Sequence, residues 1–206
     1  MAEARARRHP VDLAEPAVTR GLLARLRLTA LLHRFDERHV RAAFMLVNGF
    51  VTIALLGVLA WISRQPFVFP SLGPTAFLFF FNPSSPSATP RNAIVGHAIG
   101  IACGYASLVL FGLEHAGAAT AVGVTPPRVL AAALSFAFTG SLMILARAAH
   151  PPAGATTLLI SLGAITAPPH LLLIEVAVAL LALQAIGINR LAGLDYPLWA
   201  RRSADS

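Results

Sequence analysis

Two copies of the pattern Pro-x-x-Gly-x-Thr stand out in this chain, each followed by a short apolar run. The first copy begins at Pro70 and the second at Pro151, so the copies are 81 residues apart. Proline and glycine interrupt a helix, and a helix that restarts after them has unpartnered N–H groups, which attract anions. Short interrupted segments at corresponding places in two halves of a membrane chain indicate a transport site. We therefore predict a site for a small inorganic anion that is built from both copies.

Nine residues are candidates for this site, because each offers a hydroxyl, a backbone N–H or a positive charge near one of the copies. They are Ser71, Gly73, Thr75, Arg91 and His97 in the first half, and His150, Gly154, Thr156 and Thr157 in the second. The threonine hydroxyls could instead bond back to their own helix, and Ser71 could do either. Arg91 could attract anions to the mouth of the pathway or contact a loop or a lipid headgroup.

The candidate histidines lie among apolar residues, where an unpaired imidazole is costly. His150 directly precedes the second apolar run and could bind a proton or an anion, since histidine titrates near physiological pH. It could equally cap a carbonyl at the end of the preceding helix. His97 could face the same cavity or form a hydrogen bond that serves packing. Glu175 is the only acid inside a long apolar stretch, so it either carries a proton or stabilises the positive end of its helix.

Long apolar stretches must hold these residues in place. Four of them, at 42–62, 93–113, 129–146 and 171–188, are long enough to cross a bilayer, which takes about 20 residues. After each Pro-Gly copy the pattern is helical again, over 74–81 in the first case and up to 162 in the second. A helix over 74–81 is about 12 Å long, less than half of the hydrocarbon thickness.

We predict an all-α membrane protein with two structural repeats, 42–113 and 128–190. Each repeat has two long transmembrane helices and one half-helix element broken by proline and glycine. If the half-helices re-enter, the chain crosses four times and its halves run parallel. If each half-helix completes a crossing, the chain crosses six times and its halves are inverted. The arginines favour the inverted repeat, because six crossings put Arg91 and Arg147 inside, with Arg64 and Arg128 outside.

Composition supports the membrane assignment. The chain is 56% hydrophobic and 12% charged, with a mean hydropathy of +0.70, whereas soluble domains average about 25% charged residues. The net charge is +7, and its basic residues, all arginine, gather before residue 42 and after residue 189. Basic ends on a hydrophobic protein predict cytoplasmic termini and a multi-pass protein of the inner (plasma) membrane. This distribution argues against nucleic acid as a partner.

The terminal segments differ from the apolar part of the chain. Residues 1–41 predict a basic cytoplasmic segment with an amphipathic helix over 17–41 that lies on the membrane surface. The transmembrane domain covers 42–190, and residues 191–206 form a cytoplasmic tail. The sequence has no P-loop, nucleophile elbow or Cys/His metal pattern. We therefore expect neither an enzyme nor a metal or other cofactor.

The second copy lies in His-Pro-Pro-Ala-Gly-Ala-Thr-Thr, which begins at His150 and resembles the signature of the HPP family of integral membrane proteins. Other matching motifs are Phe-Pro-Ser-Leu-Gly-Pro-Thr-Ala from Phe69, Pro-Arg-Asn from Pro90, Gly-His from Gly96 and Tyr-Pro-Leu-Trp from Tyr196. The resemblance covers about residues 42–200 and implies a small multi-helix membrane protein. Some plastid and cyanobacterial relatives are linked to nitrite transport, which implies an anion carrier or channel here.

These observations predict a transporter or channel for a small inorganic anion, with nitrite as the first candidate. We expect a homo-oligomer, because a chain with so few helices needs partners. Two alternatives remain open. One is a proton or cation pathway that uses His97, His150 and Glu175, and the other is a membrane scaffold that transports nothing.

Overall fold

The computed structural model describes residues 27–201, and this part of the chain is built from helices. The long helices are α3 (Glu37–Ser63), α5 (Pro90–Leu110), α7 (Pro126–Leu145) and α9 (Pro168–Leu191). Each is long and apolar enough to cross a membrane. The prediction of an all-α chain with four membrane-spanning stretches is therefore confirmed.

All four long helices begin earlier than predicted. α5, α7 and α9 each start at a proline that lies three residues before the predicted starts at 93, 129 and 171, and α3 starts at Glu37 rather than 42. Proline suits the first turn of a helix, because an N–H there would have no partner within the helix. Thr89 caps α5 by accepting a hydrogen bond from the N–H of Asn92. The prediction followed apolar residues and so missed these polar first turns.

Two short helices of ten residues each, α4 (Leu72–Phe81) and α8 (Pro152–Ser161), begin inside the Pro-x-x-Gly-x-Thr copies, and α4 starts two residues before the predicted start at 74. Each is about 15 Å long, half of the hydrocarbon thickness. An extended segment precedes α4, because prolines at 66 and 70 interrupt regular helix formation there. Three smaller elements complete the described chain: α2 (Leu28–Leu32), η1 (Pro86–Ala88) and α6 (Ala119–Val122).

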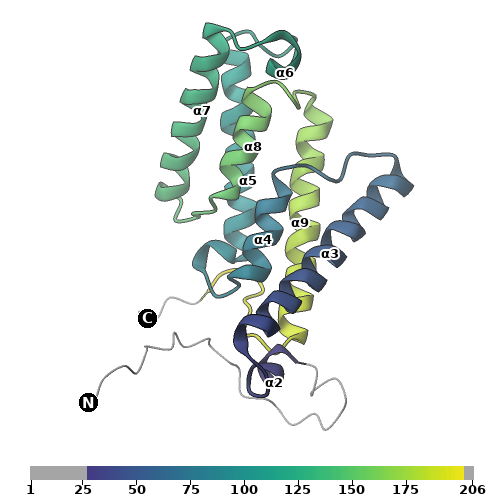
Figure 1. Ribbon diagram of the computed structural model, residues 1–206. Helices are drawn as coiled ribbons and strands as arrows, with labels where there is room; N and C mark the ends of the chain where they lie inside the picture. The colour runs from purple at the N-terminus through teal and green to yellow at the C-terminus, as the bar shows by residue number, and fades with distance from the viewer. Residues whose placement is uncertain (1–26, 202–206) are drawn as a thin grey trace, which may run out of the picture.

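The helices alternate in direction along the bundle (Figure 1). We call the end where α3 begins the proximal end and the opposite end the distal end. α4 ends at the proximal end, because Phe80 packs against Phe44 near the start of α3, with ring centroids 6.2 Å apart. Asn189, near the end of α9, donates to the Phe79 carbonyl at 3.1 Å. Thus α4 and α9 both run toward the proximal end, opposite to α3.

α5 and α8 run in the other direction and lie side by side. Gly96 near the start of α5 adjoins His150, and Gly104 further along adjoins Ile160 near the end of α8. α7 returns beside them, since its last carbonyls contact Arg91 at the start of α5. α5 therefore occupies the centre and contacts α7, α8 and α9 (Figure 1).

α3 lies at the edge of the bundle (Figure 1). In its most apolar stretch 11% of residues are buried, against 39% in α5 and α9. Its exposed side chains include Leu46, Phe50, Trp61 and Ile62. An apolar face of this size on a membrane protein contacts lipid or another protein chain rather than water.

The predicted amphipathic helix over 17–41 is not continuous in the part that can be described. Residues 17–26 lie outside the described range, and the remainder forms α2, a turn and the first residues of α3. Asp36 ends the turn and caps α3, because its carboxylate accepts hydrogen bonds from the N–H groups of Arg38 and His39. Hydrogen bonds from the backbone and ring of His39 lower the pKa of Asp36. The capping aspartate is the physical reason for the break.

The described part of the C-terminal tail packs across the proximal end. The N–H of Arg91 donates to the Trp199 carbonyl at 3.0 Å, and Arg201 donates to the Pro83 carbonyl at 3.3 Å. The Tyr196 hydroxyl donates to the Ala88 carbonyl, and burial raises the pKa of this hydroxyl. The tail thereby ties down the segment that connects α4 with α5.

Candidate functional site

Four buried polar side chains meet inside the bundle: Thr75, His97, His150 and Thr156, which we call the His–Thr cluster. Each is 0% exposed. The Thr75 hydroxyl lies 2.9 Å from Nε2 of His97 and 3.2 Å from Nε2 of His150. The Thr156 hydroxyl lies 2.7 Å from Nδ1 of His97. The equivalent threonines of the two motif copies therefore bind the same imidazole from opposite ring nitrogens.

Four different elements hold the cluster. Thr75 lies in the first turn of α4, His97 in α5, His150 in the turn before α8, and Thr156 in α8. The two imidazoles face each other with ring centroids 5.2 Å apart. Nδ1 of His150 lies 2.8 Å from the Ser87 carbonyl of η1. His150 therefore does not cap the preceding helix, and His97 is not confined to a bond within its own helix.

Three glycines of α5 allow α8 to approach closely enough to form the cluster. Gly96, Gly100 and Gly104 are spaced four apart and so share one face of the helix. A Cβ on Gly100 would lie 2.8 Å from the Ala153 carbonyl oxygen, and one on Gly96 would lie 2.8 Å from Cβ of His150. Small residues at this spacing let membrane helices pack backbone to backbone. Sequence reasoning missed this ridge, although the four-residue spacing was visible.

Thr157 serves the contact between helices rather than the cluster. Its hydroxyl lies 3.2 Å from the Gly100 carbonyl and 2.9 Å from the hydroxyl of Thr139 in α7. Thr139 is 1% exposed and was not a candidate. The sequence signal that could have found Thr139 is its hydroxyl within an apolar stretch. A transmembrane helix directs such a hydroxyl toward neighbouring helices.

The two motif glycines lie in different surroundings. Gly73 is exposed, and a Cβ there would have no atom within 4 Å. Gly154 is buried, and a Cβ there would lie 2.9 Å from the ring of Phe136. The N–H of Gly154 donates to the Pro151 carbonyl, and the N–H of Ala153 donates to the His150 carbonyl. These two amides at the start of α8 are thus already hydrogen bonded in this conformation.

Ser71 precedes α4 by one residue and is 1% exposed. Its hydroxyl has no hydrogen-bond partner within the described residues. Ser71 lies one turn before Thr75, whose hydroxyl is 3.4 Å from the Ser71 carbonyl. A buried hydroxyl without a partner is costly unless something else binds it. Ser71 is therefore the candidate with an unused donor.

Arg91 joins the ends of two helices instead of the cluster. Its guanidinium donates to the carbonyls of Arg147 at 2.8 Å and Ala146 at 3.1 Å, at the end of α7. A cation stabilises the negative end of a helix. Of the two predicted roles, this geometry matches the loop contact, because the guanidinium donates to main-chain oxygens of the turn after α7.

Arg128 has a similar role at the distal end, which the sequence did not reveal. It is 2% exposed, and its guanidinium donates to the carbonyls of Ser161 at 3.2 Å and Gly117 at 2.9 Å. The predicted loop arginine is thus a buried connection between the end of α8 and the segment that joins α5 to α6. The long side chain reaches main-chain carbonyls that the sequence pattern cannot locate.

Glu175 is not hydrogen bonded to the cluster. α9 begins at Pro168, so Glu175 lies two turns into the helix and not at its start. Within the described residues both carboxylate oxygens are buried and lack a hydrogen-bond partner. Stabilising the positive end of α9 is therefore not its role, because that effect is confined to the first turn.

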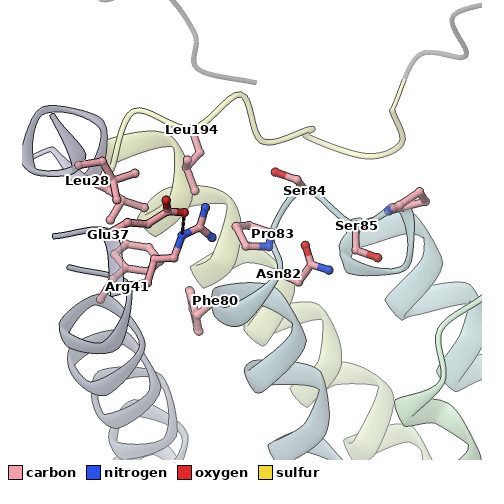
Figure 2. A pocket seen from close by; sticks show the side chains of 12 residues that line it. Leu28, Glu37, Arg41, Phe80, Asn82, Pro83, Ser84, Ser85 and Leu194 are labelled. Atoms are coloured by element: carbon pink, nitrogen blue, oxygen red, sulfur yellow. Dashed lines mark hydrogen bonds and ion pairs between the residues drawn. The ribbon is translucent and has the colours of Figure 1, made fainter. Parts of the chain in front are cut away.

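A cavity of about 600 Å³ lies at the proximal end (Figure 2). Apolar residues such as Leu28, Phe80 and Leu194 line one part of it, and Asn82 and Ser84 line another. Figure 2 shows the ion pair between Arg41 and Glu37 at its wall, at 2.8 Å. None of the cluster side chains lines this cavity. Its size therefore does not make it part of the same site.

The comparisons with known proteins agree with the helical architecture. A family model described as "HPP, transmembrane region" matches residues 36–197. The chain belongs to this HPP family. A curated transmembrane protein from Dictyostelium discoideum is 33% identical over 112 residues, which cover 54% of this chain and 33% of the relative. The chain thus aligns with about a third of that relative's length. No solved structure matches the chain significantly.

The His–Thr cluster of this HPP protein combines groups that both donate and accept hydrogen bonds. Within residues 27–201, no charged side chain forms a hydrogen bond with any of its four members. The side-chain hydrogen bonds of the cluster run between its own members and to the carbonyls of Ser71 and Ser87. Because all four side chains are fully buried, the conformation described here is closed to water at both ends.

Proposed function

We propose that this HPP protein transports a small inorganic anion, with nitrite as the first candidate, through a site at the His–Thr cluster. One observation carries the proposal: Thr75 and Thr156, from equivalent places in two distant segments, both lie within hydrogen-bond distance of His97. Polar groups buried in an apolar membrane bundle are expensive and mark a functional site by default. The partnerless hydroxyl of Ser71, one turn from Thr75, supplies a further donor.

The same geometry favours two inverted repeats with six crossings. α3, α4 and α5 alternate in direction, and α7, α8 and α9 alternate in the opposite order (Figure 1). In the six-crossing arrangement α4 and α8 are the half-helices, and the backbone adjoining each of them completes its crossing of the membrane. A pseudo-twofold axis in the membrane plane would pass near His97, the residue that both threonines bind. Transport sites at the interface of inverted repeats follow this plan.

In the closed conformation the anion has no route to the cluster, so one of the enclosing segments must move. The proximal cover consists of η1 and the turn before α8, which the bond between His150 and the Ser87 carbonyl joins. Opening this contact would expose His150 first. Alternating access of this kind requires the two halves to rock around a fixed site.

Orientation and assembly belong to the same proposal. Both termini are cytoplasmic, the bilayer is the inner (plasma) membrane, and copies associate through apolar faces such as that of α3. The protein is a transporter and not an enzyme, needs no cofactor, and has no nucleic-acid partner. Cysteines placed at Ser84 and at Thr120, in a Cys103→Ala background, test the orientation with an impermeant thiol reagent on intact cells. We expect labelling at Thr120 and protection at Ser84; the reverse pattern would invert the topology.

Flux measurements test the function. The purified protein is reconstituted in liposomes, and uptake of nitrite, nitrate, formate and chloride is compared with empty liposomes. We expect uptake of at least one anion, reduced strongly by His97→Gln and unchanged by Thr125→Val, a hydroxyl removed at an exposed position. The absence of anion uptake above empty liposomes would refute the proposal. The scaffold alternative predicts that His97→Gln leaves the cellular role of the protein intact.

A further inference from the structure

The His–Thr cluster has a defined hydrogen-bond direction, which can be assigned from its proximal end. A main-chain carbonyl can only accept, so Nδ1 of His150, at 2.8 Å from the Ser87 carbonyl, carries the proton. In a neutral imidazole the other nitrogen then accepts. Nε2 of His150 therefore takes its hydrogen bond from the Thr75 hydroxyl at 3.2 Å. Donation from Thr75 to the Ser71 carbonyl is longer, at 3.4 Å, and would leave Nε2 of His150 without a donor.

The assignment continues to the distal side of the cluster. Because Thr75 has one hydroxyl proton and gives it to His150, it must accept from Nε2 of His97 at 2.9 Å. His97 is then protonated at Nε2, and its Nδ1 accepts from the Thr156 hydroxyl at 2.7 Å. The two histidines thus hold opposite tautomers, Nε2–H for His97 and Nδ1–H for His150. Every bond in the chain points from Thr156 toward Ser87.

We propose that this chain is a proton relay which makes anion transport proton-coupled, a step that rests on the function proposed above. When the distal side opens, a proton from water there binds the Thr156 oxygen, and the original Thr156 proton moves to Nδ1 of His97. The Nε2 proton of His97 moves to the Thr75 oxygen, and the original Thr75 proton moves to Nε2 of His150. One proton has entered, and His150 is the one group that has become charged. The Ser87 carbonyl cannot pass a proton on, so the relay ends there.

The charged His150 needs a counter-charge, because an unpaired ion buried in an apolar bundle is strongly unfavourable. The groups around it supply none: α5 presents His97, α4 presents Thr75 and Phe79, and η1 presents the Ser87 carbonyl. At the α7–α8 turn, Arg147 is exposed, and the cation Arg91 is bound to carbonyls. Glu175 of α9 forms no hydrogen bond to the cluster. The transported anion itself is the counter-ion.

This arrangement fixes the stoichiometry at one proton for each monovalent anion, so the coupled movement is electroneutral. His150 accepts the proton and the anion together, and it releases the proton to water at the proximal end when its contact with Ser87 opens. His97 and Thr75 act as relay residues that deliver the proton. Thr75 is the critical link, because it is bonded to both histidines.

Proteoliposomes that contain a pH-sensitive dye test the coupling, with nitrate as the probe and empty liposomes as the reference. We expect an inward nitrate gradient to acidify the lumen, at a rate unaffected by a potassium diffusion potential set with valinomycin. Thr75→Val should slow both nitrate uptake and acidification by about 100-fold, in the range of a lost proton-transfer group. Thr75→Ser should restore them, and Thr125→Val should leave them unchanged.

The outcomes separate the coupling from the proposed function. Nitrate uptake that follows the membrane potential, without acidification, would overturn the relay and leave anion transport standing. Acidification that needs no anion would overturn the coupling in favour of a plain proton pathway. No movement of any anion would reject the proposed function and the coupling together.

Nitrogen NMR of the protein in lipid bilayers tests the hydrogen-bond chain without any transport measurement. Selective ¹⁵N labelling of histidine distinguishes Nδ1–H from Nε2–H, and His97→Gln and His150→Gln assign the two signals among the seven histidines. We expect neutral rings of opposite tautomer, with Thr75→Val disturbing both and Thr125→Val disturbing neither. Identical tautomers in the two rings would contradict the directional chain.

Discussion

The two Pro-x-x-Gly-x-Thr copies place equivalent threonines on one imidazole, yet the helices that begin within them have different neighbours. α8 lies against the glycine ridge of α5, and Gly154 touches Phe136 of α7. α4 lies against α3 and α9, and its Gly73 is exposed. The shared part of the motif is thus its hydroxyl, whereas the glycine is a close-packing residue in one copy alone. Both helices have buried side chains, but only in the α8 copy does the motif glycine lie against a neighbouring helix.

The largest effect in this comparison is expected at the ridge that holds α8. Gly100→Leu should destabilise the protein by about 3 kcal/mol or prevent folding. A Cβ at this position would already lie 2.8 Å from the Ala153 oxygen, so the larger leucine side chain would force the two helix backbones apart. Thermal unfolding in detergent measures the change. Gly187→Leu is the matched control, since nothing lies within 4 Å of a Cβ there. Equal melting temperatures for the two variants would mean that the ridge does not hold α8.

The next largest losses of stability are expected for the two threonines of the cluster, and each loss should depend on how many histidines the threonine contacts. Thr75→Val breaks bonds to His97 and His150, whereas Thr156→Val breaks the bond to His97. We expect losses of about 2 and about 1 kcal/mol respectively, since each buried group left unpaired costs about 1 kcal/mol or more. Urea unfolding of the purified variants gives both values. A larger loss for Thr156→Val would reverse the assigned roles.

The motif glycines give a smaller and more direct contrast. Gly154→Ala should destabilise by about 1 kcal/mol, because the new methyl group presses on the Phe136 ring. Gly73→Ala should cost less than about 1 kcal/mol, since the added methyl group meets the ring of the following Pro74 but no side chain from another helix. Gly154→Ala should therefore lower the melting temperature more than Gly73→Ala. A shift of Gly73→Ala as large as that of Gly154→Ala would show that α4 is packed as tightly as α8.

A last contrast, of similar size, concerns Arg91, which ties the start of α5 to the end of α7. Arg91→Lys should cost about 1 kcal/mol, because lysine keeps the charge but loses the forked geometry that reaches two carbonyls. Arg64→Lys, at an exposed residue in the loop after α3, serves as the control. Unfolding free energies at low salt compare them. If Arg91→Lys lowered anion uptake and left stability unchanged, Arg91 would belong to the transport pathway instead.

Much of the architecture could be predicted from the sequence because it depends on local patterns. Apolar length gave the four long helices, and proline spacing located α4 and α8. Helix starts were missed where Pro90, Pro126 and Pro168 extend them into polar residues. The prediction of one helix over 17–41 was wrong because Asp36 caps the start of a new helix, although the apolar residues recur at helical spacing on both sides of it.

The site was foreseen as a list of residues and not as a geometry. His97, His150, Thr75 and Thr156 were all candidates, but their distances depend on how α5 packs against α4 and α8. The other candidates Gly73, Arg91 and Thr157 form no hydrogen bonds with these four side chains. Glycine also suits an exposed position, arginine also stabilises the end of a helix, and threonine also serves helix packing. The buried contacts of Arg128 and Thr139 involve distant carbonyls and hydroxyls, which no single helix pattern specifies.

If the two motif copies act as one site, a double-mutant cycle of anion uptake should show it most directly. Nitrate uptake into proteoliposomes is measured for Thr75→Val, Thr156→Val, the double variant and Thr125→Val. If both threonines serve the same chain through His97, each single variant should lower uptake strongly, and the double variant should be little slower than Thr75→Val. Independent, multiplicative losses, or uptake as fast as in Thr125→Val, would contradict the claim that Thr75 and Thr156 form a single transport site.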